Sequence, residues 1–408
     1  MPGDAERHRA LVNVFGETAR LAGFGHVITP IFEDLGVFKR LGESTDVVNK
    51  EMYDFVAKDG NHYALRPELT ASVVRAFVQH RPAVPWKVWY EGPQFRYERP
   101  QAGRYRQFFQ IGVEALGTDD PALDAEVIAL AWHFYAALGL RNITLLLNSL
   151  GDPTCRPAYL VALTDYFDTR RTELSEQSQH TLQVNPLRVL DSKRPQDQAI
   201  IDEAPVMVDH LSPETGEHFA GVRSVLDRLE VPYDISPRLV RGLDYYTRTT
   251  FEFASHALDG AQNALGGGGR YDALASDLGG PETPGIGFAL GVDRILLACD
   301  AEGVFPAGAE VADVFIIDVT GGTEAAVLQR TMQSAGIASQ RAYDARSMKA
   351  QFRAADKSGA QIAVVIGDDE VASGTITIRP LMGENRDQVT VDSATLVDEL
   401  QTRLSTSG

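Results

Sequence analysis

The chain has 408 residues and a formal net charge of −18 at pH 7, with 44% hydrophobic and 23% charged residues. This composition is typical of a globular protein of two to three domains, and its acidity argues against a general nucleic-acid coat protein. No run of about 18 apolar residues occurs, the first ten residues lack a signal-peptide core, and two cysteines are too few for a disulfide framework. We therefore expect a cytoplasmic protein without a membrane span.

The first third of the chain predicts two helices, one short strand and a hairpin. Apolar residues recur at helical spacing over residues 6–23. Pro30 interrupts a short strand over residues 26–32, which is typical of an edge or interface strand. A helix is expected from Pro67 onward, because proline and glutamate suit a first turn. Residues 87–111 predict an antiparallel hairpin.

The remainder predicts two domains joined by a linker. After a helix over 122–139, residues of about 155–230 are helical and polar, which indicates an insertion into a larger sheet domain. Strands are expected at 248–254 and 285–290, followed by a helix from Val292. A Gly-, Ala- and Pro-rich stretch then leads to alternating strands and helices, which predict a sheet of about five strands. The expected domains are residues 1–305, including the insertion, and residues 312–408.

Part of the predicted hairpin is basic within an acidic chain, since residues 94–106 contain four arginines and the single acid Glu98. Alternation along its second strand separates an apolar face from a polar one. The apolar face has Phe109, Ile111, Val113 and Ala115, and the polar face has Arg106, Phe108, Gln110 and Glu114. Alternation alone favours a half-solvated sheet. The residue types favour a ligand site instead, because arginine suits phosphate, phenylalanine can stack on a base, and Gln110 and Glu114 can accept from an amine or imidazole.

Two further clusters suggest ligand contacts. Arginines surround the pair Tyr245–Tyr246, whose side chains we expect on opposite sides of an extended segment. The run Gly266–Gly269 is typical of a flexible loop, although it would also let a backbone approach a ligand closely. Arg294 lies near the start of a predicted helix, where the helix dipole disfavours a cation by roughly 0.3–1 kcal/mol unless a polyphosphate is bound there. No P-loop, H-E-x-x-H motif or nucleophile elbow occurs.

Together these segments resemble the signature motifs of class II aminoacyl-tRNA synthetases, and of the histidyl-tRNA synthetase family in particular. The resemblance rests on Pro30 and on the peptides FRYE, GRYRQFFQIGVE, GIGFALGVDR, LVRGLDYYTRT and GGGGRYDAL. ESTDVVNKEMYDF, LRPELTA, NPLRVLDSK and DKSGAQIAVVIGDDEVASGTITIRPL also match, so that the resemblance covers nearly the whole chain. It implies an α+β catalytic domain built on an antiparallel sheet with flanking helices, a helical insertion and a C-terminal α/β anticodon-binding domain.

The resemblance also implies a reaction and the residues that perform it. L-histidine and ATP, with Mg²⁺, would give histidyl-adenylate, and the histidyl group would pass to the 3′ end of tRNA(His), in a homodimer. The implied histidine-binding residues are Glu68, Thr70, Gln110, Glu114, Tyr246 and Tyr271. The implied ATP-binding residues are Arg96, Glu98, Arg104, Phe108 and Arg294, with Arg241, Arg96 and Arg294 as catalytic residues. Gln101 and Arg106 would contact the tRNA acceptor end, and no metal ligand is identified.

Two departures and two alternatives accompany this resemblance. The chain opens with MPGDAERHR where the family has a Gly-Thr-x-Asp-type stretch, so that stretch is missing or shortened. The third motif has Asp293 where glutamate is common, a shorter acid that we expect to be tolerated. One alternative is a non-catalytic paralog that regulates histidine biosynthesis, which would lack the anticodon domain and lose site residues. The other is an enzyme or sensor that activates histidine without charging tRNA.

Overall fold

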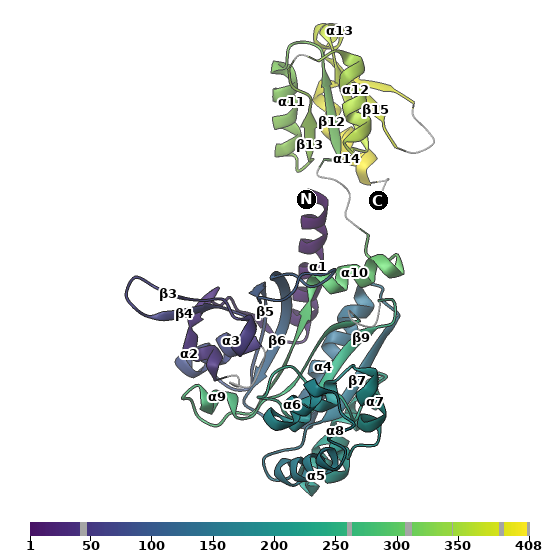
Figure 1. Ribbon diagram of the computed structural model, residues 1–408. Helices are drawn as coiled ribbons and strands as arrows, with labels where there is room; N and C mark the ends of the chain where they lie inside the picture. Colours follow the sequence, from purple (N-terminus) through teal and green to yellow (C-terminus); the bar gives the residue numbers. More distant parts are fainter. Residues whose placement is uncertain (41–46, 259–262, 307–311, 345, 383–386, 406–408) are drawn as a thin grey trace. The chain divides into compact units, whose positions relative to one another are not determined.

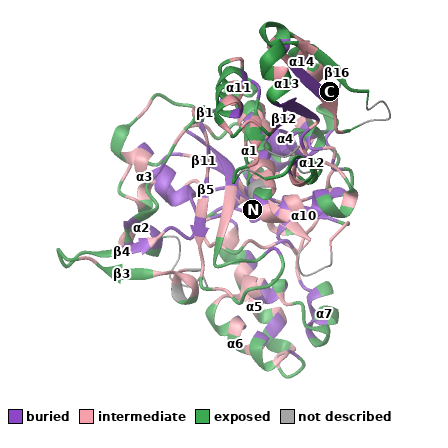
Figure 2. Ribbon diagram, turned by 90° about the horizontal axis from the view of Figure 1, so that it is seen from above, coloured by how far each residue is buried: buried purple, intermediate pink, exposed green. Residues whose placement is uncertain are grey.

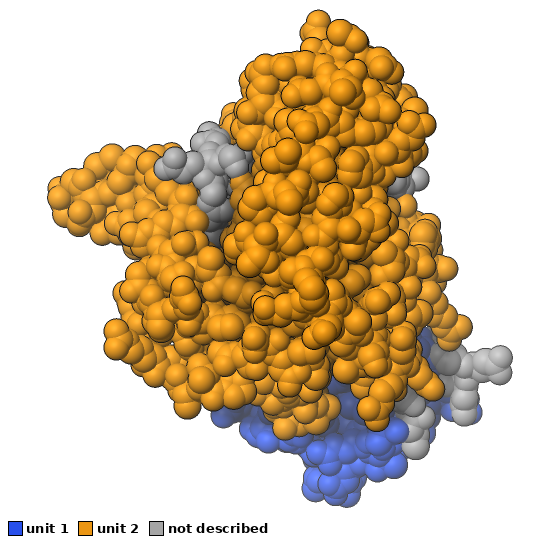
Figure 3. All heavy atoms as spheres, turned by 90° about the horizontal axis from the view of Figure 1, so that it is seen from below, with its two compact units in different colours: residues 1–9, 307–408 blue, residues 10–306 orange. Residues whose placement is uncertain are grey.

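The computed structural model describes residues 1–40, 47–258, 263–306, 312–344, 346–382 and 387–405 (Figure 1). Residues 43–46 of the ESTDVVNKEMYDF peptide lie outside these ranges. The chain separates into two compact units, which Figure 3 colours differently. The larger unit comprises residues 10–306, and the smaller one comprises residues 1–9 and 307–408. No helix among the described residues is long and apolar enough to cross a membrane.

An eight-stranded mixed sheet forms the centre of the larger unit (Figure 1). Its first and last pairs are parallel, and the pairs between them are antiparallel. In spatial order the strands are β1 (Gly25–His26), β5 (Trp86–Phe95), β6 (Gln107–Leu116), β11 (Gly285–Gly291), β10 (Ala264–Arg270), β9 (Thr247–Ser255), β7 (Ile143–Ser149) and β8 (Asp234–Ile235). The predicted hairpin is therefore β5–β6, whereas the glycine run, expected as a loop, lies in the central strand β10.

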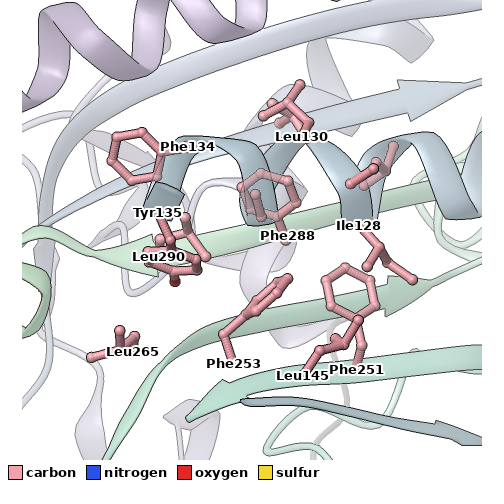
Figure 4. Packing of buried hydrophobic residues seen from close by; sticks show 14 of the residues in the cluster. Ile128, Leu130, Phe134, Tyr135, Leu145, Phe251, Phe253, Leu265, Phe288 and Leu290 are labelled. Carbon is pink, nitrogen blue, oxygen red and sulfur yellow. The ribbon is translucent and has the colours of Figure 1, made fainter. Parts of the chain in front are cut away.

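Helices cover one face of this sheet. They are α1 (Pro2–Leu21), α4 (Pro121–Ala137), α8 (Pro213–Arg228) and α10 (Val292–Glu302). Figure 4 shows the packing, in which side chains of α4, among them Ile128, Phe134 and Tyr135, face Phe251 and Phe253 of β9 and Phe288 of β11, with the rings of Tyr135 and Phe253 5.2 Å apart. Burying one such aromatic side chain contributes about 1.5–3 kcal/mol. Because strand side chains alternate, residues at intervening positions face away from this core and are free to form a site.

A small three-stranded sheet and its helices lie beside the first strands. The sheet has the order β2 (Phe32–Asp34), β4 (His62–Leu65), β3 (Asp54–Val56). One hydrophobic cluster joins it to α2 (Leu35–Lys39), α3 (Thr70–His80), the π-helix η1 (Val47–Glu51) and α9 (Leu274–Asp277). The β3–β4 hairpin projects from the larger unit, and Figure 2 shows it largely exposed. The single strand expected over 26–32 is thus divided between β1 and β2. The helix expected from Pro67 begins instead at Thr70, where Glu68 accepts hydrogen bonds from the first free amides.

The expected insertion contains a hydrophobic cluster of its own, which runs from Cys155 to Met207. It comprises α5 (Arg156–Thr169), α6 (Glu176–Val184), the 3₁₀ helix η2 (Pro186–Asp191), α7 (Pro195–Asp202) and the 3₁₀ helix η3 (Met207–His210). The last helix of the 155–230 range, α8, packs instead on α4 through Phe219, Val222 and Leu226, which belong to the main core. The part with a separate core is therefore shorter than the sequence indicated.

The smaller unit is an α/β domain with the predicted five-stranded sheet. The sheet order is β13 (Ser339–Arg341), β12 (Val314–Asp318), β14 (Ile362–Ile366), β15 (Thr375–Pro380), β16 (Val389–Asp392). The helices are α11 (Thr323–Ser334), α12 (Met348–Lys357), α13 (Asp368–Ser373), the 3₁₀ helix η4 (Ser393–Thr395) and α14 (Leu396–Ser405). Alternate residues of β12 and β14 enter two clusters, one on each face, which explains why these strands are continuously apolar.

Candidate active site

The face of the large sheet opposite the main core forms a cavity of about 630 Å³. This volume lies within the roughly 300–1,000 Å³ that is usual for ligand pockets. Its walls come from the start of α3, the β5–β6 hairpin, the loop before β9, strands β9 to β11, and the start of α10. The cavity thus gathers segments that are more than 200 residues apart in the chain, between Glu68 and Arg294.

The β5–β6 hairpin contributes a cation beside an aromatic ring. The guanidinium carbon of Arg96 lies 5.3 Å from the centroid of the Phe108 ring, and Arg96 Nε donates to Pro67 O over 2.9 Å. Beside them Arg104 Nε is 2.7 Å from a carboxylate oxygen of Glu98. The cavity is lined by Arg96, Glu98, Arg104 and Phe108 together with Gln110. The predicted alternation is therefore correct, since Ile111, Val113 and Ala115 point into the core.

A buried carboxyl group lies directly behind this wall. Glu114 is fully buried and accepts from Thr70 Oγ1 over 2.7 Å, from Tyr90 OH over 3.1 Å, and from the hydroxyl of Tyr271. Burial raises the pKa of Glu114 to about 8, and the hydrogen bonds from Tyr271 and Thr70 oppose this shift. Among the predicted site residues, Glu114 and Tyr271 do not line the cavity, whereas Thr70 does. Glu114 and Tyr271 lie behind the cavity wall, and the side chain of Thr70 connects Glu114 to it.

A second carboxyl group, Glu68, lines the cavity at the start of α3. Its two oxygens accept from the backbone amides of Thr70 over 2.7 Å and of Ala71 over 2.9 Å. Burial raises the pKa of Glu68, and these hydrogen bonds oppose the rise. Amide donors at a helix start hold a carboxylate in place, so Glu68 has a fixed orientation toward the cavity.

The loop before β9 brings Arg241 and two tyrosines to the opposite wall. Arg241 Nη1 is 2.6 Å from Glu252 Oε2 on β9. Tyr245 and Tyr246 both line the cavity, with ring centroids 4.6 Å apart. The expectation that the two rings point opposite ways is therefore wrong, because residues 242–245 form turns and bends rather than an extended strand. Burial raises the pKa of Tyr246, which keeps its hydroxyl protonated as a donor.

Two polar atoms on this surface have no protein partner. Gln110 Oε1 and Arg241 Nε are buried, and neither has a hydrogen-bond partner among the described residues. Leaving such an atom unsatisfied costs about 1–3 kcal/mol. A ligand that offers a donor to Gln110 and an acceptor to Arg241 would remove this cost.

Arg294 closes the cavity from the third position of α10. Its Nη1 donates to Ala264 O over 2.7 Å, and its Nε donates to Gly103 O over 3.1 Å. Burial lowers its pKa from the usual value, and nearby Arg104 acts in the same direction. Arg294 therefore does not point into solvent. Two backbone carbonyl groups bind this cation, which the helix dipole disfavours at the start of α10.

Two further predicted residues, Arg106 and Gln101, do not line the cavity, and the insertion adds two lining residues that were not predicted. Arg106 stacks its guanidinium 4.2 Å from the centroid of the Tyr97 ring, and Gln101 is exposed on the hairpin loop. Asp191 and Lys193, in and just after η2, line the cavity from the insertion. The peptide NPLRVLDSK, which contains both, was the only sequence signal for them. Among the described residues, no group of three or more His, Cys, Asp or Glu side chains could hold a metal ion.

The comparisons with known proteins agree over the full length. A family model described as histidyl-tRNA synthetase matches residues 1–295, and one described as an anticodon-binding domain matches residues 313–403. Histidine–tRNA ligase of Mycobacterium marinum is 48% identical over 99% of this chain and 96% of its own length. That of Corynebacterium urealyticum is 48% identical over 97% of this chain and 93% of its own length.

A solved structure extends the match to the fold. The crystal structure of apo histidyl-tRNA synthetase from S. aureus superposes with a TM-score of 0.81 at 35% identity, over 98% of this chain and 97% of that one. The expected class II catalytic fold with a C-terminal α/β domain is therefore confirmed. With a family model over most of the chain and relatives at 48% identity, the chain belongs to the histidyl-tRNA synthetase family.

Proposed function

We propose that this chain is a histidine–tRNA ligase, which activates L-histidine with ATP and transfers the histidyl group to the 3′ end of tRNA(His). The observation that carries the proposal is the cavity on the sheet, which Arg96, Arg241 and Arg294 line together with the polar groups of Glu68 and Gln110. Three cations suit a triphosphate, and the polar groups suit an amino acid. Full-length relatives at 48% identity with the same activity support this function over a regulatory paralog.

The histidine would occupy the part of the cavity near α3. Its α-ammonium would meet Glu68, Thr70 and Gln110, and its imidazole would lie between Tyr246 and the Glu114 group behind Thr70. Tyr271 would act through Glu114, to which it donates. Such a site rejects apolar amino acids strongly, because their binding would leave buried polar groups without partners.

The ATP would lie along the hairpin, with adenine on Phe108 and the phosphates near Arg96, Glu98, Arg104 and Arg294. The histidine carboxylate attacks the α-phosphorus, a P–O bond to the β-phosphate breaks, and pyrophosphate leaves. Arg241 would stabilise the negative charge that develops on the α-phosphate, so positioning and electrostatics supply the catalysis. Mg²⁺ would neutralise part of the triphosphate. The cavity fits it, since the carboxylates of Glu98 and Glu252 could each complete a site made largely by phosphates.

We further propose that the chain is cytoplasmic and forms a homodimer. The hairpin loop with Gln101 and Arg106 would contact the tRNA acceptor end. An exposed apolar group near Pro30 supports the dimer: Ile28, Ile31, Phe32, Phe55 and Val56. Exposed apolar side chains that lie together, as Phe32 and Phe55 do with ring centroids 6.1 Å apart, are typical of protein interfaces. Light scattering coupled to size exclusion checks this, since a monomer mass at micromolar concentration would contradict it.

Charging of a tRNA(His) transcript with radiolabelled histidine tests the function, together with histidine-dependent ATP–pyrophosphate exchange. We expect both reactions with the purified chain. Exchange without charging would indicate a histidine-activating enzyme or sensor instead, and the absence of both would indicate a regulatory paralog. Equal exchange with other amino acids would contradict histidine specificity.

A further inference from the structure

The loop of residues 237–246 carries Arg241 and Tyr246, yet it has no helix or strand of its own. Its conformation therefore depends on side chains that bind its backbone. Asn148 of β7 holds one end, where its Nδ2 donates to Leu239 O over 3.1 Å. The other contacts come largely from the helical insertion, which makes this insertion a candidate support for the catalytic arginine.

Arg188 of η2 makes the most direct of these contacts. Its Nη2 donates to Gly242 O over 2.7 Å and lies 3.0 Å from Asp244 Oδ1. Gly242 follows Arg241 directly in the chain. The guanidinium of Arg188 therefore binds the backbone carbonyl next to Arg241 and the side chain of Asp244, two residues after Gly242. Asn185, at the start of η2, also donates to Asp244 Oδ1, over 3.5 Å.

The insertion also binds the loop on both sides of Gly242. On one side, Arg238 of the loop donates to Asp202 O over 2.7 Å at the end of α7, and Val240 packs on the insertion's hydrophobic cluster. On the other side, Arg156 at the start of α5 donates to Tyr246 O over 2.7 Å. The segment between Val240 and Tyr246 is thus fixed at both ends by the insertion, with Arg188 at its middle.

We propose that Arg188 is a positioning residue for Arg241, and that through it the insertion supports the activation of histidine itself, before any tRNA is bound. The inference rests on the proposed function. Charge stabilisation by an arginine depends on its being held in place before the reaction, so a mobile Arg241 would lose catalytic effect while ATP still bound to Arg96 and Arg294. Loss of Arg188 should therefore lower kcat more than it raises KM.

Arg188→Ala tests this in the full-length protein, measured by histidine-dependent ATP–pyrophosphate exchange without tRNA. We expect kcat to fall at least tenfold, with KM for ATP changed by less than threefold and with partial recovery in Arg188→Lys. Arg241→Ala defines the floor of activity. The matched control is Arg171→Ala, which removes a partly exposed insertion arginine whose ion-pair partner is Asp168, 3.6 Å away. An Arg188→Ala enzyme with kcat within twofold of the original would overturn the proposal.

A second measurement does not depend on catalysis. Amide hydrogen exchange followed by mass spectrometry should show faster exchange of the peptide over residues 238–246 in Arg188→Ala, with β9 and β10 unchanged. Unaltered exchange of the peptide over residues 238–246 would overturn the positioning role of Arg188. This conclusion would hold even if the chain showed no catalytic activity. Absence of histidine-dependent activity in the original chain would instead reject the proposed function, so the two failures are distinguishable. Faster exchange throughout the insertion and a large fall in melting temperature would indicate a general structural role, and would also reject the proposal.

Discussion

Glu114 combines full burial with three hydroxyl donors, and its protonation should be visible in histidine binding. Burial raises its pKa to about 8, so the group is mostly neutral at pH 6.5 and mostly ionised at pH 8.5. In the proposed complex the imidazole N–H of histidine donates to Glu114, and this hydrogen bond favours the ionised form of the carboxyl group. We therefore expect the Kd for histidine to fall about tenfold or more between these pH values. Isothermal titration calorimetry measures this change directly.

Glu114→Gln is the control, because histidine itself titrates near pH 6.5. The variant retains this titration and loses that of the carboxyl group, so its pH dependence should be much shallower. Stability gives a second check. Since the pKa is above its usual value of 4.5 in the folded state, the folded protein binds more protons between pH 4.5 and 8, and its stability falls as pH rises through this range. The variant should lack that fall, and parallel curves would contradict the assignment.

The four consecutive glycines of the central strand β10 show why residues without side chains can position a site. A Cβ added to Gly269 would lie 2.6 Å from Thr249 O and 2.9 Å from Tyr246 Cδ1, and one added to Gly267 would lie 2.4 Å from Phe251 O and 3.0 Å from Arg241 Nη1. These two glycines let the site residues lie directly against the sheet. Gly268, between them, faces the adjacent strand β11, where a Cβ would overlap the carbonyl oxygen of Gly287.

We expect Gly268→Ala to destabilise the larger unit by about 1–3 kcal/mol, because the colliding atom belongs to backbone and cannot rotate away. Thermal or urea unfolding followed by circular dichroism measures the change. Gly216→Ala is the matched control, since nothing lies within 4 Å of the added Cβ and the residue is in α8. Alanine should stabilise that helix by up to about 1 kcal/mol. Equal effects of the two substitutions would contradict the packing account.

The elements also show which features the sequence could predict. The β5–β6 hairpin was predictable because side chains alternate with period two, which assigned Phe108 and Gln110 to one face. The strand β10 was not predictable, because a run of glycines has no hydrophobic alternation and its place in the sheet depends on pairing with β9 and β11. Tyr245 and Tyr246 were placed wrongly because Arg156, 90 residues away in the chain, fixes the turn at Tyr246 O. Such long-range contacts leave no local signal.

At the scale of the whole molecule, the class of each domain was predictable, whereas the contribution of the insertion to the site was not. Continuous apolar strands and intervening helices indicated the C-terminal α/β fold directly. The insertion had only its helical, polar composition and one matching peptide, NPLRVLDSK. Nothing in that peptide indicates that Asp191 and Lys193 reach the cavity, since this depends on how η2 packs against the loop before β9.

The charge of the protein is unevenly distributed, since the chain is acidic as a whole and residues 94–106 of the hairpin are basic. The chain carries a net charge of −18, so tRNA must be attracted by local cations such as Arg99 and Arg106 on the hairpin rather than by the molecule as a whole. Each neutralised phosphate releases counterions, so KM for tRNA should rise roughly tenfold or more between 50 and 200 mM KCl if about three phosphates are contacted.

The exchange reaction provides the internal comparison, because ATP and histidine bind inside a cavity whose charges are partly buried and less screened. We expect its KM for ATP to change by less than threefold over the same range of KCl. Arg106→Ala, whose guanidinium lies on Tyr97 outside the cavity, should reduce the salt dependence of charging and leave exchange unaltered. Equal salt dependence of the two reactions would mean that tRNA and ATP are not held by separate sets of arginines, and the division of the hairpin between the two polyanions would then be wrong.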